Sequence, residues 1–263
     1  MTTTLKIDKK ENGVVLITFN RPEALNAINL ESMIAFWKAI RDLQQDADLR
    51  VLVLTGEGEK AFCSGGDLVE LRGFVSQDDA RYFTRIMTDA LHTMEQLPVP
   101  VIAAINGYAL GGGSEIALAC DMRLIDSATR MGMVQINMGL TPGWGAGQRL
   151  LRIVGYSKAM EMLLKGESLE ADDLIALKLA NQKVDEGQAL VSAMTLANQI
   201  AERPVNVVRG IKQLLRAGLT MSYDAARQAE YDIFPDLWAD EPHIQAVEAF
   251  FERQAAKKQE TDD

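Results

Sequence analysis

The segment 106–115 carries three consecutive glycines, Gly111–Gly113, followed closely by the carboxylate of Glu115. It lies between the apolar run Val101–Ile105, which predicts a strand, and the apolar run Ile116–Cys120, which predicts a helix. Glycines let a ligand approach the backbone closely, and amides at the start of a helix lack intrahelical partners and attract negative charge. The pattern predicts an anion site with Glu115 beside it as a proton carrier.

A second glycine segment, Ala61–Asp67, follows the apolar run Val51–Thr55. If the amides of Gly66 and Gly112 point at one spot, they form an oxyanion hole. Each donor of such a site stabilises a transition state by about 2.7–4 kcal/mol. The alternative is two unrelated tight turns, which is what an isolated pair of glycines more often marks.

Composition and charge exclude several classes of function. The net charge of −10 with scattered basic residues argues against a nucleic-acid surface. Met1–Lys10 lacks a secretory apolar core, and no apolar run reaches the roughly 20 residues of a membrane helix. The only cysteines, Cys63 and Cys120, are too few for a disulfide framework. His92 and His243 have no second His or Cys nearby, so no metal site is predicted. We expect a cytoplasmic protein.

Strands and helices that position these segments alternate along the first part of the chain. Two short apolar runs around the polar turn Lys9–Gly13 predict a hairpin. Further strands are predicted at 51–55, 101–105 and 122–125, and helices at 30–43, 80–96 and 114–120. Repeated crossovers of this kind imply a mainly parallel sheet in an α/β domain.

The C-terminal third has a different character, because helical patterns dominate it. They cover 157–164, 170–179, 187–201, 205–217, 222–238 and 244–257. We therefore expect a core domain over residues 1–200 and a helical C-terminal region over 201–263.

Four segments resemble, in order, motifs of the crotonase (enoyl-CoA hydratase/isomerase) superfamily. They are Asn20–Ile28, Ala61–Leu68, Ile105–Ile116 and Gly139–Gly143, and the resemblance is strong from Leu5 to about Gly155. It implies a spiral of repeated ββα units with a C-terminal helical region used in trimerisation. A homotrimer or a hexamer made of two trimers would follow.

The resemblance also implies an acyl-CoA thioester substrate whose oxygen accepts hydrogen bonds from Gly66 and Gly112. Enolate stabilisation is the step that such enzymes share. The CoA and pantetheine path would be lined by Ala24, Ser64, Gly66, Asp67 and Leu68. In the tail, Arg253 or Lys257 would meet the CoA phosphates. No separate cofactor is implied, because coenzyme A is part of the substrate.

Hydratases of this family commonly use two glutamates, and Glu115 occupies the first position. The second position falls on Gln135, whose amide forms hydrogen bonds but takes no proton at neutral pH. Hydration with Glu115 alone is the first interpretation. An isomerase is less favoured, because isomerases of the family more often keep the acid at the position of Gln135.

Two further alternatives stay open. In an alkylmalonyl-CoA decarboxylase, loss of carbon dioxide generates the enolate without a base. Pro142–Gly145 and Asp236–Ala239 resemble segments of ethylmalonyl-CoA decarboxylases, although Trp144 and Trp238 are also simple candidates for packing aromatics. The other alternative is a non-catalytic acyl-CoA-binding protein whose activity was lost with the second carboxylate.

Overall fold

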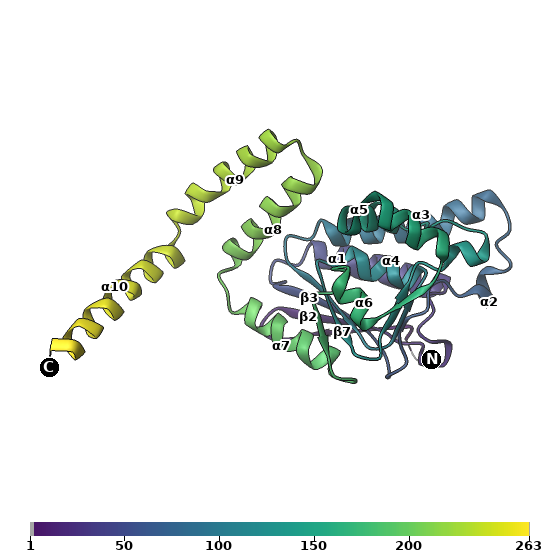
Figure 1. Cartoon of the computed structure of the whole chain (residues 1–263), viewed down its shortest axis with the longest axis horizontal. Coiled ribbons are helices and arrows are strands. Elements are labelled where there is room, and N and C mark those ends of the chain that lie inside the picture. The colour runs from purple at the N-terminus through teal and green to yellow at the C-terminus, as the bar shows by residue number, and fades with distance from the viewer. Residues whose placement is uncertain (1–2, 263) are drawn as a thin grey trace. The chain divides into compact units, whose positions relative to one another are not determined.

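The computed structural model describes residues 3–262, with side chains described up to residue 255. The chain divides into two compact units, residues 1–201 and 202–263 (Figure 1). The first unit holds both sheets and the second holds three helices. Each unit is described below by itself.

A six-stranded sheet with the order β1-β2-β3-β5-β7-β10 forms the centre of the first unit. Its strands are β1 (Leu5–Lys9), β2 (Val14–Phe19), β3 (Val51–Gly56), β5 (Val101–Ile105), β7 (Met122–Asp126) and β10 (Gln182–Val184). Only β1 runs antiparallel to its neighbour, β2, and every other pair is parallel. The predicted hairpin and the predicted mainly parallel sheet are thus confirmed.

Alternating side chains of this sheet supply two apolar layers. In β3, Leu52 and Leu54 point into the larger core, whereas Val51 and Val53 point to the opposite face. The larger core contains residues of α1 (Leu30–Gln44), α3 (Gln77–Glu95) and α4 (Gly112–Ala119). The opposite face is covered by α7 (Ala189–Ala201), which contributes Ala189, Ala193 and Ala197. Both faces of a parallel sheet are therefore buried, as such sheets require.

A second, four-stranded sheet has the order β4-β6-β8-β9 and was not predicted. Its strands are β4 (Ala61–Cys63), β6 (Tyr108–Leu110), β8 (Arg130–Gly132) and β9 (Ser168–Glu170), each of three residues. Three residues are too few to show a period of two. In the succession β3-β4, β5-β6 and β7-β8, each pair gives one strand to each sheet, and helices follow every pair. This is the repeated ββα arrangement that the sequence resemblance implied.

The predicted direct junction between the strand at 101–105 and the helix after the glycines is wrong. Strand β5 does not pass directly into helix α4, because the short strand β6 lies between them and α4 begins at Gly112. Gly107, at φ +128°, turns the chain from β5 into β6, and a Cβ there would lie 2.3 Å from the carbonyl oxygen of Lys60. Only glycine fits this turn.

Between β8 and β10 lie the 3-10 turn η2 (Gln135–Met138), α5 (Ala146–Lys165) and α6 (Ala171–Ala176). The backbone of Gly155 is not helical, at φ 77° and ψ 167°, so α5 consists of two helical stretches. The helix predicted at 157–164 is the second of them, and the first was missed. In the second unit, α8 (Val205–Thr220), α9 (Tyr223–Trp238) and α10 (Glu241–Asp262) match the predicted helices with shifted ends. Among residues 3–262, no helix is long and apolar enough to cross a bilayer.

Candidate functional site

The two glycine segments converge in the structure. A Cβ placed on Gly65 would lie 3.0 Å from the oxygen of Leu110 and 3.2 Å from the amide nitrogen of Gly112. Gly112 is the first residue of α4, so its N–H has no partner within the helix. At the isolated bridge between Ile28 and Gly66, the hydrogen bonds run from Ile28 N to Gly65 O and from Asp67 N to Ile28 O. The bridge therefore leaves the N–H of Gly66 unused, near that of Gly112.

The residues expected along the CoA path also lie together. Ser64 donates its amide hydrogen to Leu25 O, at 3.1 Å, and its hydroxyl to Ala24 O, at 3.4 Å. Ala24 ends the 3-10 turn η1 (Pro22–Ala24). Leu68 follows as the first residue of α2 (Leu68–Leu71), with an exposed side chain. Hydrogen bonds thus join the segments 24–28 and 64–68 side by side, with Ala24, Ser64, Gly66 and Leu68 partly or fully exposed.

Asp67 is buried and has a structural partner that the sequence did not reveal. One carboxylate oxygen accepts the amides of Val69 and Glu70 as the N-cap of α2, and the other pairs with Arg21 at 2.7 Å. The hydrogen bond from Arg21 lowers the pKa of Asp67 below its ordinary value of 3.8. The cap could be read from the sequence, but Arg21 lies 46 residues away along the chain.

This ion pair predicts a pH-dependent stability. An Asp67→Asn variant keeps the helix cap but loses the charge, so we expect its free energy of unfolding at neutral pH to fall by about 1.5–3 kcal/mol. Because the folded pKa lies below 3.8, this contribution is complete above that value and is lost as the pH falls through the folded pKa. Urea unfolding of wild type and variant at neutral pH and below pH 3.8 measures it. An unchanged difference at low pH would contradict the assignment.

Glu115 is held as a carboxylate in the first turn of α4. It is 2% exposed, and four N–H groups donate to its two oxygens. The donors are Gln135 Nε2 at 3.0 Å, and the amides of Gly143 at 3.2 Å, Trp144 at 2.7 Å and Ala146 at 3.1 Å. The last lies at the start of α5, where the helix dipole favours negative charge. Two donors therefore bind each carboxylate oxygen, which fills about all the acceptor positions of the group.

Gln135 lies against Glu115 and donates a hydrogen bond to it. Its Nε2 must face the carboxylate, because a carboxylate only accepts hydrogen bonds, and this fixes Oε1 on the other side. Oε1 is buried and has no hydrogen-bond partner among the described residues. An unsatisfied buried acceptor costs about 1–3 kcal/mol. The site therefore contains an acceptor to which an incoming hydrogen-bond donor can bind.

Trp144 packs within the site, where it contacts both Glu115 and Gly112. It is 6% exposed, its amide binds Glu115, and its ring lies over Gly112. A Cβ on Gly112 would lie only 2.2 Å from Cζ3 of this ring. At Gly66, the other candidate donor, a Cβ would lie 3.1 Å from Cδ1 of Leu71. One apolar side chain thus flanks each of the two candidate donors.

Ser114 was missed as a structural residue of the site. Its hydroxyl lies 2.6 Å from Ala109 O and 2.9 Å from Gly132 O, and it accepts the amide of Gly132 at 3.1 Å. These contacts tie the first turn of α4 to β6 and β8. The sequence shows only a serine directly after three glycines, and its need for partners follows from its burial in the structure.

The histidines, the Cys63 thiol and the basic tail residues are further groups that could take part in chemistry or binding. His92 is exposed near the end of α3, and His243 stacks on Trp238 with ring centroids 4.4 Å apart. Burial raises the pKa of the Cys63 thiol to about 12, so the thiol is protonated at neutral pH. Arg253 is exposed and donates to its own helix at Ala249 O, and the side chain of Lys257 lies outside the described residues. Among the described residues, no group of three or more His, Cys, Asp or Glu could hold a metal ion.

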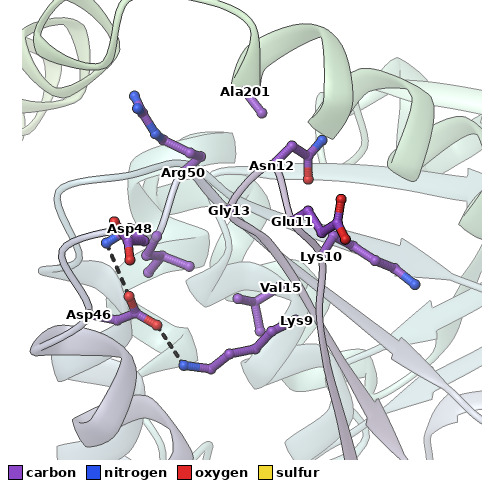
Figure 2. Close-up of a pocket in the computed structure, with 11 residues that line it drawn as sticks. Lys9, Lys10, Glu11, Asn12, Gly13, Val15, Asp46, Asp48, Arg50 and Ala201 are labelled. Carbon is purple, nitrogen blue, oxygen red and sulfur yellow. Dashed lines mark hydrogen bonds and ion pairs between the residues drawn. The ribbon is translucent and has the colours of Figure 1, made fainter.

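A cavity of about 610 Å³ lies at the turn between β1 and β2 and shares no residue with the glycine site (Figure 2). Its charged lining consists of Lys9, Lys10, Glu11, Asp46, Asp48 and Arg50. Lys9 pairs with Asp46 at 2.6 Å. Because positive and negative groups balance, this cavity is not the expected anion site.

Comparison with known proteins agrees with the motifs. The family model described as enoyl-CoA hydratase/isomerase matches residues 9–260. A short-chain-enoyl-CoA hydratase of Clostridium acetobutylicum is 34% identical, covering 93% of this chain and 94% of that protein. An ethylmalonyl-CoA decarboxylase of Gallus gallus is 30% identical, covering 93% of this chain and 83% of that protein.

The fold has close counterparts among solved structures. The crystal structure of an enoyl-CoA hydratase from Bacillus anthracis superposes with a TM-score of 0.90 at 31% identity, covering 95% of this chain and 96% of that chain. The match thus spans almost the whole of both chains.

Proposed function

The chain belongs to the enoyl-CoA hydratase/isomerase family, and on that premise we propose that it adds water to the double bond of a short-chain enoyl-CoA thioester. The observation that carries the proposal is the buried carboxylate of Glu115. Four N–H donors bind its two oxygens, three residues after an unpaired amide at the start of the same helix. Hydration requires a base that activates water and a donor that stabilises the enolate, and the first turn of α4 carries a candidate for each.

In the proposed mechanism, the thioester oxygen accepts hydrogen bonds from the amides of Gly66 and Gly112. A water oxygen bonds to C3 while Glu115 takes one of its protons, and the electrons of the C2–C3 double bond move into the enolate. Protonated Glu115 then returns that proton to C2, which restores the thioester carbonyl. Water is thereby added, and Glu115 ends as it began. The enolate charge develops at the two amides, where prearranged donors stabilise it most.

Gln135 has to move for this cycle to run. A carboxylate offers about four lone-pair sites, and all four are occupied in the structure. Three of the donors are backbone amides in and before α5, whereas Gln135 is a side chain with an unsatisfied Oε1. We propose that it swings aside when water enters and accepts one hydrogen of that water through Oε1. This frees one oxygen of Glu115 for proton transfer.

Decarboxylation of an alkylmalonyl-CoA is the second candidate, because a relative carries that name and because Pro142–Gly145 resembles such enzymes. Two features place it second. The free atom of Gln135 is an acceptor, which suits a water or hydroxyl and repels a substrate carboxylate. The four donors around Glu115 favour a base over the acid that would quench an enolate formed by loss of carbon dioxide.

A panel of thioesters tests the choice. We expect crotonyl-CoA to be hydrated with a kcat/KM far above the rate of carbon dioxide release from ethylmalonyl-CoA or methylmalonyl-CoA. Absorbance of the conjugated thioester reports the first reaction, and captured carbon dioxide reports the second. Faster decarboxylation would reverse the order of the candidates. Tight binding of every thioester without turnover would support the non-catalytic alternative.

The proposal includes assembly and location. The reaction needs no separate cofactor, because water is the nucleophile and Glu115 moves the proton. A homotrimer, alone or paired into a hexamer, is supported by large apolar side chains exposed on the helical unit 202–263, namely Leu219, Tyr231, Phe234, Trp238, Phe250 and Phe251. Cys63 and Cys120 are buried cysteines outside any disulfide, which is compatible with a cytoplasmic location.

A further inference from the structure

We propose that the ion pair between Glu95 and Arg149 is a positioning device for the active site, which acts through Trp144. The inference rests on the proposed function of Glu115 and Gly112. Neither member of the pair belongs to the groups that would touch substrate. Their role is to hold the residue that touches both the base and the oxyanion turn.

The contacts form a continuous path. Arg149 Nε and Nη2 donate to the two oxygens of Glu95 at 2.9 and 3.0 Å, and Nη1 donates to Trp144 O at 2.6 Å. The amide of Trp144 in turn donates to Glu115 at 2.7 Å, and its ring lies over Gly112. The guanidinium therefore fixes the carbonyl of the residue whose amide and ring hold the site.

The ion pair between Glu95 and Arg149 has the geometry typical of strong ion pairs. It is bidentate, and the side chains of Arg149 and Glu95 are 10% and 23% exposed. Planar bidentate pairs of this kind are the ones that fix orientation, unlike single contacts between exposed charges. Only arginine can supply this fork and a third donor to the carbonyl at the same time.

Electrostatics explain why Glu95 is needed. Arg149 folds back over the start of its own helix, where a Cβ on Gly145 would lie 3.0 Å from Nη1. A helix N-terminus disfavours a positive charge, so a carboxylate beside the guanidinium stabilises it there. The carboxylate of Glu95, which comes from the last turn of α3, offsets that charge. The contact between α3 and α5 thereby determines the position of Trp144.

Two variants test the pair. Glu95→Gln keeps the shape but loses the charge, and Arg149→Lys keeps the charge but loses the fork. We expect kcat for crotonyl-CoA to fall about ten- to a hundredfold in each, because small displacements of reacting groups are that costly, while KM changes little. Glu170→Gln is the control, since it breaks the Arg130 ion pair between β8 and β9, away from Trp144. The control should retain its kcat.

A spectroscopic readout separates positioning from general loss of stability. In a Trp37→Phe, Trp238→Phe background, Trp144 is the only tryptophan, and its emission should shift to the red when Glu95→Gln is added. A kcat equal to that of the control, or a fall in kcat without a change in emission, would overturn the inference. If the wild type hydrates no thioester, the proposed function fails. The emission then decides the positioning role alone, since a shift supports it and no shift overturns it.

Discussion

A Glu115→Gln variant is expected to lose about 10²- to 10⁴-fold in kcat for hydration of crotonyl-CoA, the range typical of a positioned general base. The amide keeps the size of the side chain but takes no proton from water. It also turns an NH2 group toward N–H donors that bind the carboxylate, because Glu115 accepts two hydrogen bonds at each oxygen. Stopped-flow absorbance of the conjugated thioester measures the loss.

The matched control is Asp126→Asn. Asp126 is also a buried carboxylate, and it accepts the amide of Ala189 at the start of α7 at 2.7 Å. Burial raises its pKa, so the neutral amide is a tolerable replacement there. We expect this variant to keep its kcat, which would show that removing a buried charge at a helix start is not itself inactivating. Full turnover by Glu115→Gln would disprove the assigned base.

The sequence predicted the helices and strands that are long enough to show a clear pattern of apolar residues. Helices such as α1 and α3 bury a stripe of residues at helical spacing, and the strands β3 and β5 are continuous apolar runs. The strands of the second sheet escaped prediction because each has three residues. Their pairing depends on turns such as that at Gly107, whose tight contact with Lys60 is visible only in three dimensions.

Some residues of the candidate site could likewise be predicted from the sequence, and others could not. Gly66, Gly112 and Glu115 could be proposed from the chain because their chemistry depends on local backbone and on a motif. The surroundings of Glu115 could not, because its donors come from residues 20 to 31 positions later. The same holds for Glu95 and Arg149, which are 54 residues apart. A side chain's type suggests what it can do, but its partners are decided by packing.

The second large effect is expected for Gly112→Ala. The backbone tolerates alanine in this helix, so the obstacle is steric: the new Cβ would lie 2.2 Å from Trp144 Cζ3. The ring has to move, and it pulls the Trp144 amide away from Glu115. We expect kcat to fall about 10²- to 10³-fold, as when an oxyanion donor is removed. The overpacked site should also lower the free energy of unfolding by about 1–3 kcal/mol.

Two variants decide whether the ring is the cause. Gly147→Ala introduces the same methyl group within α5, where a Cβ would meet nothing within 4 Å, so we expect activity to persist and stability to rise by about 0.5–1 kcal/mol. In a Trp144→Ala background, Gly112→Ala should cost far less than it does alone, since residues in contact are not additive. Equal losses with and without the ring would mean that the methyl group obstructs the oxyanion directly. The pocket above Gly112 would then belong to the substrate and not to Trp144.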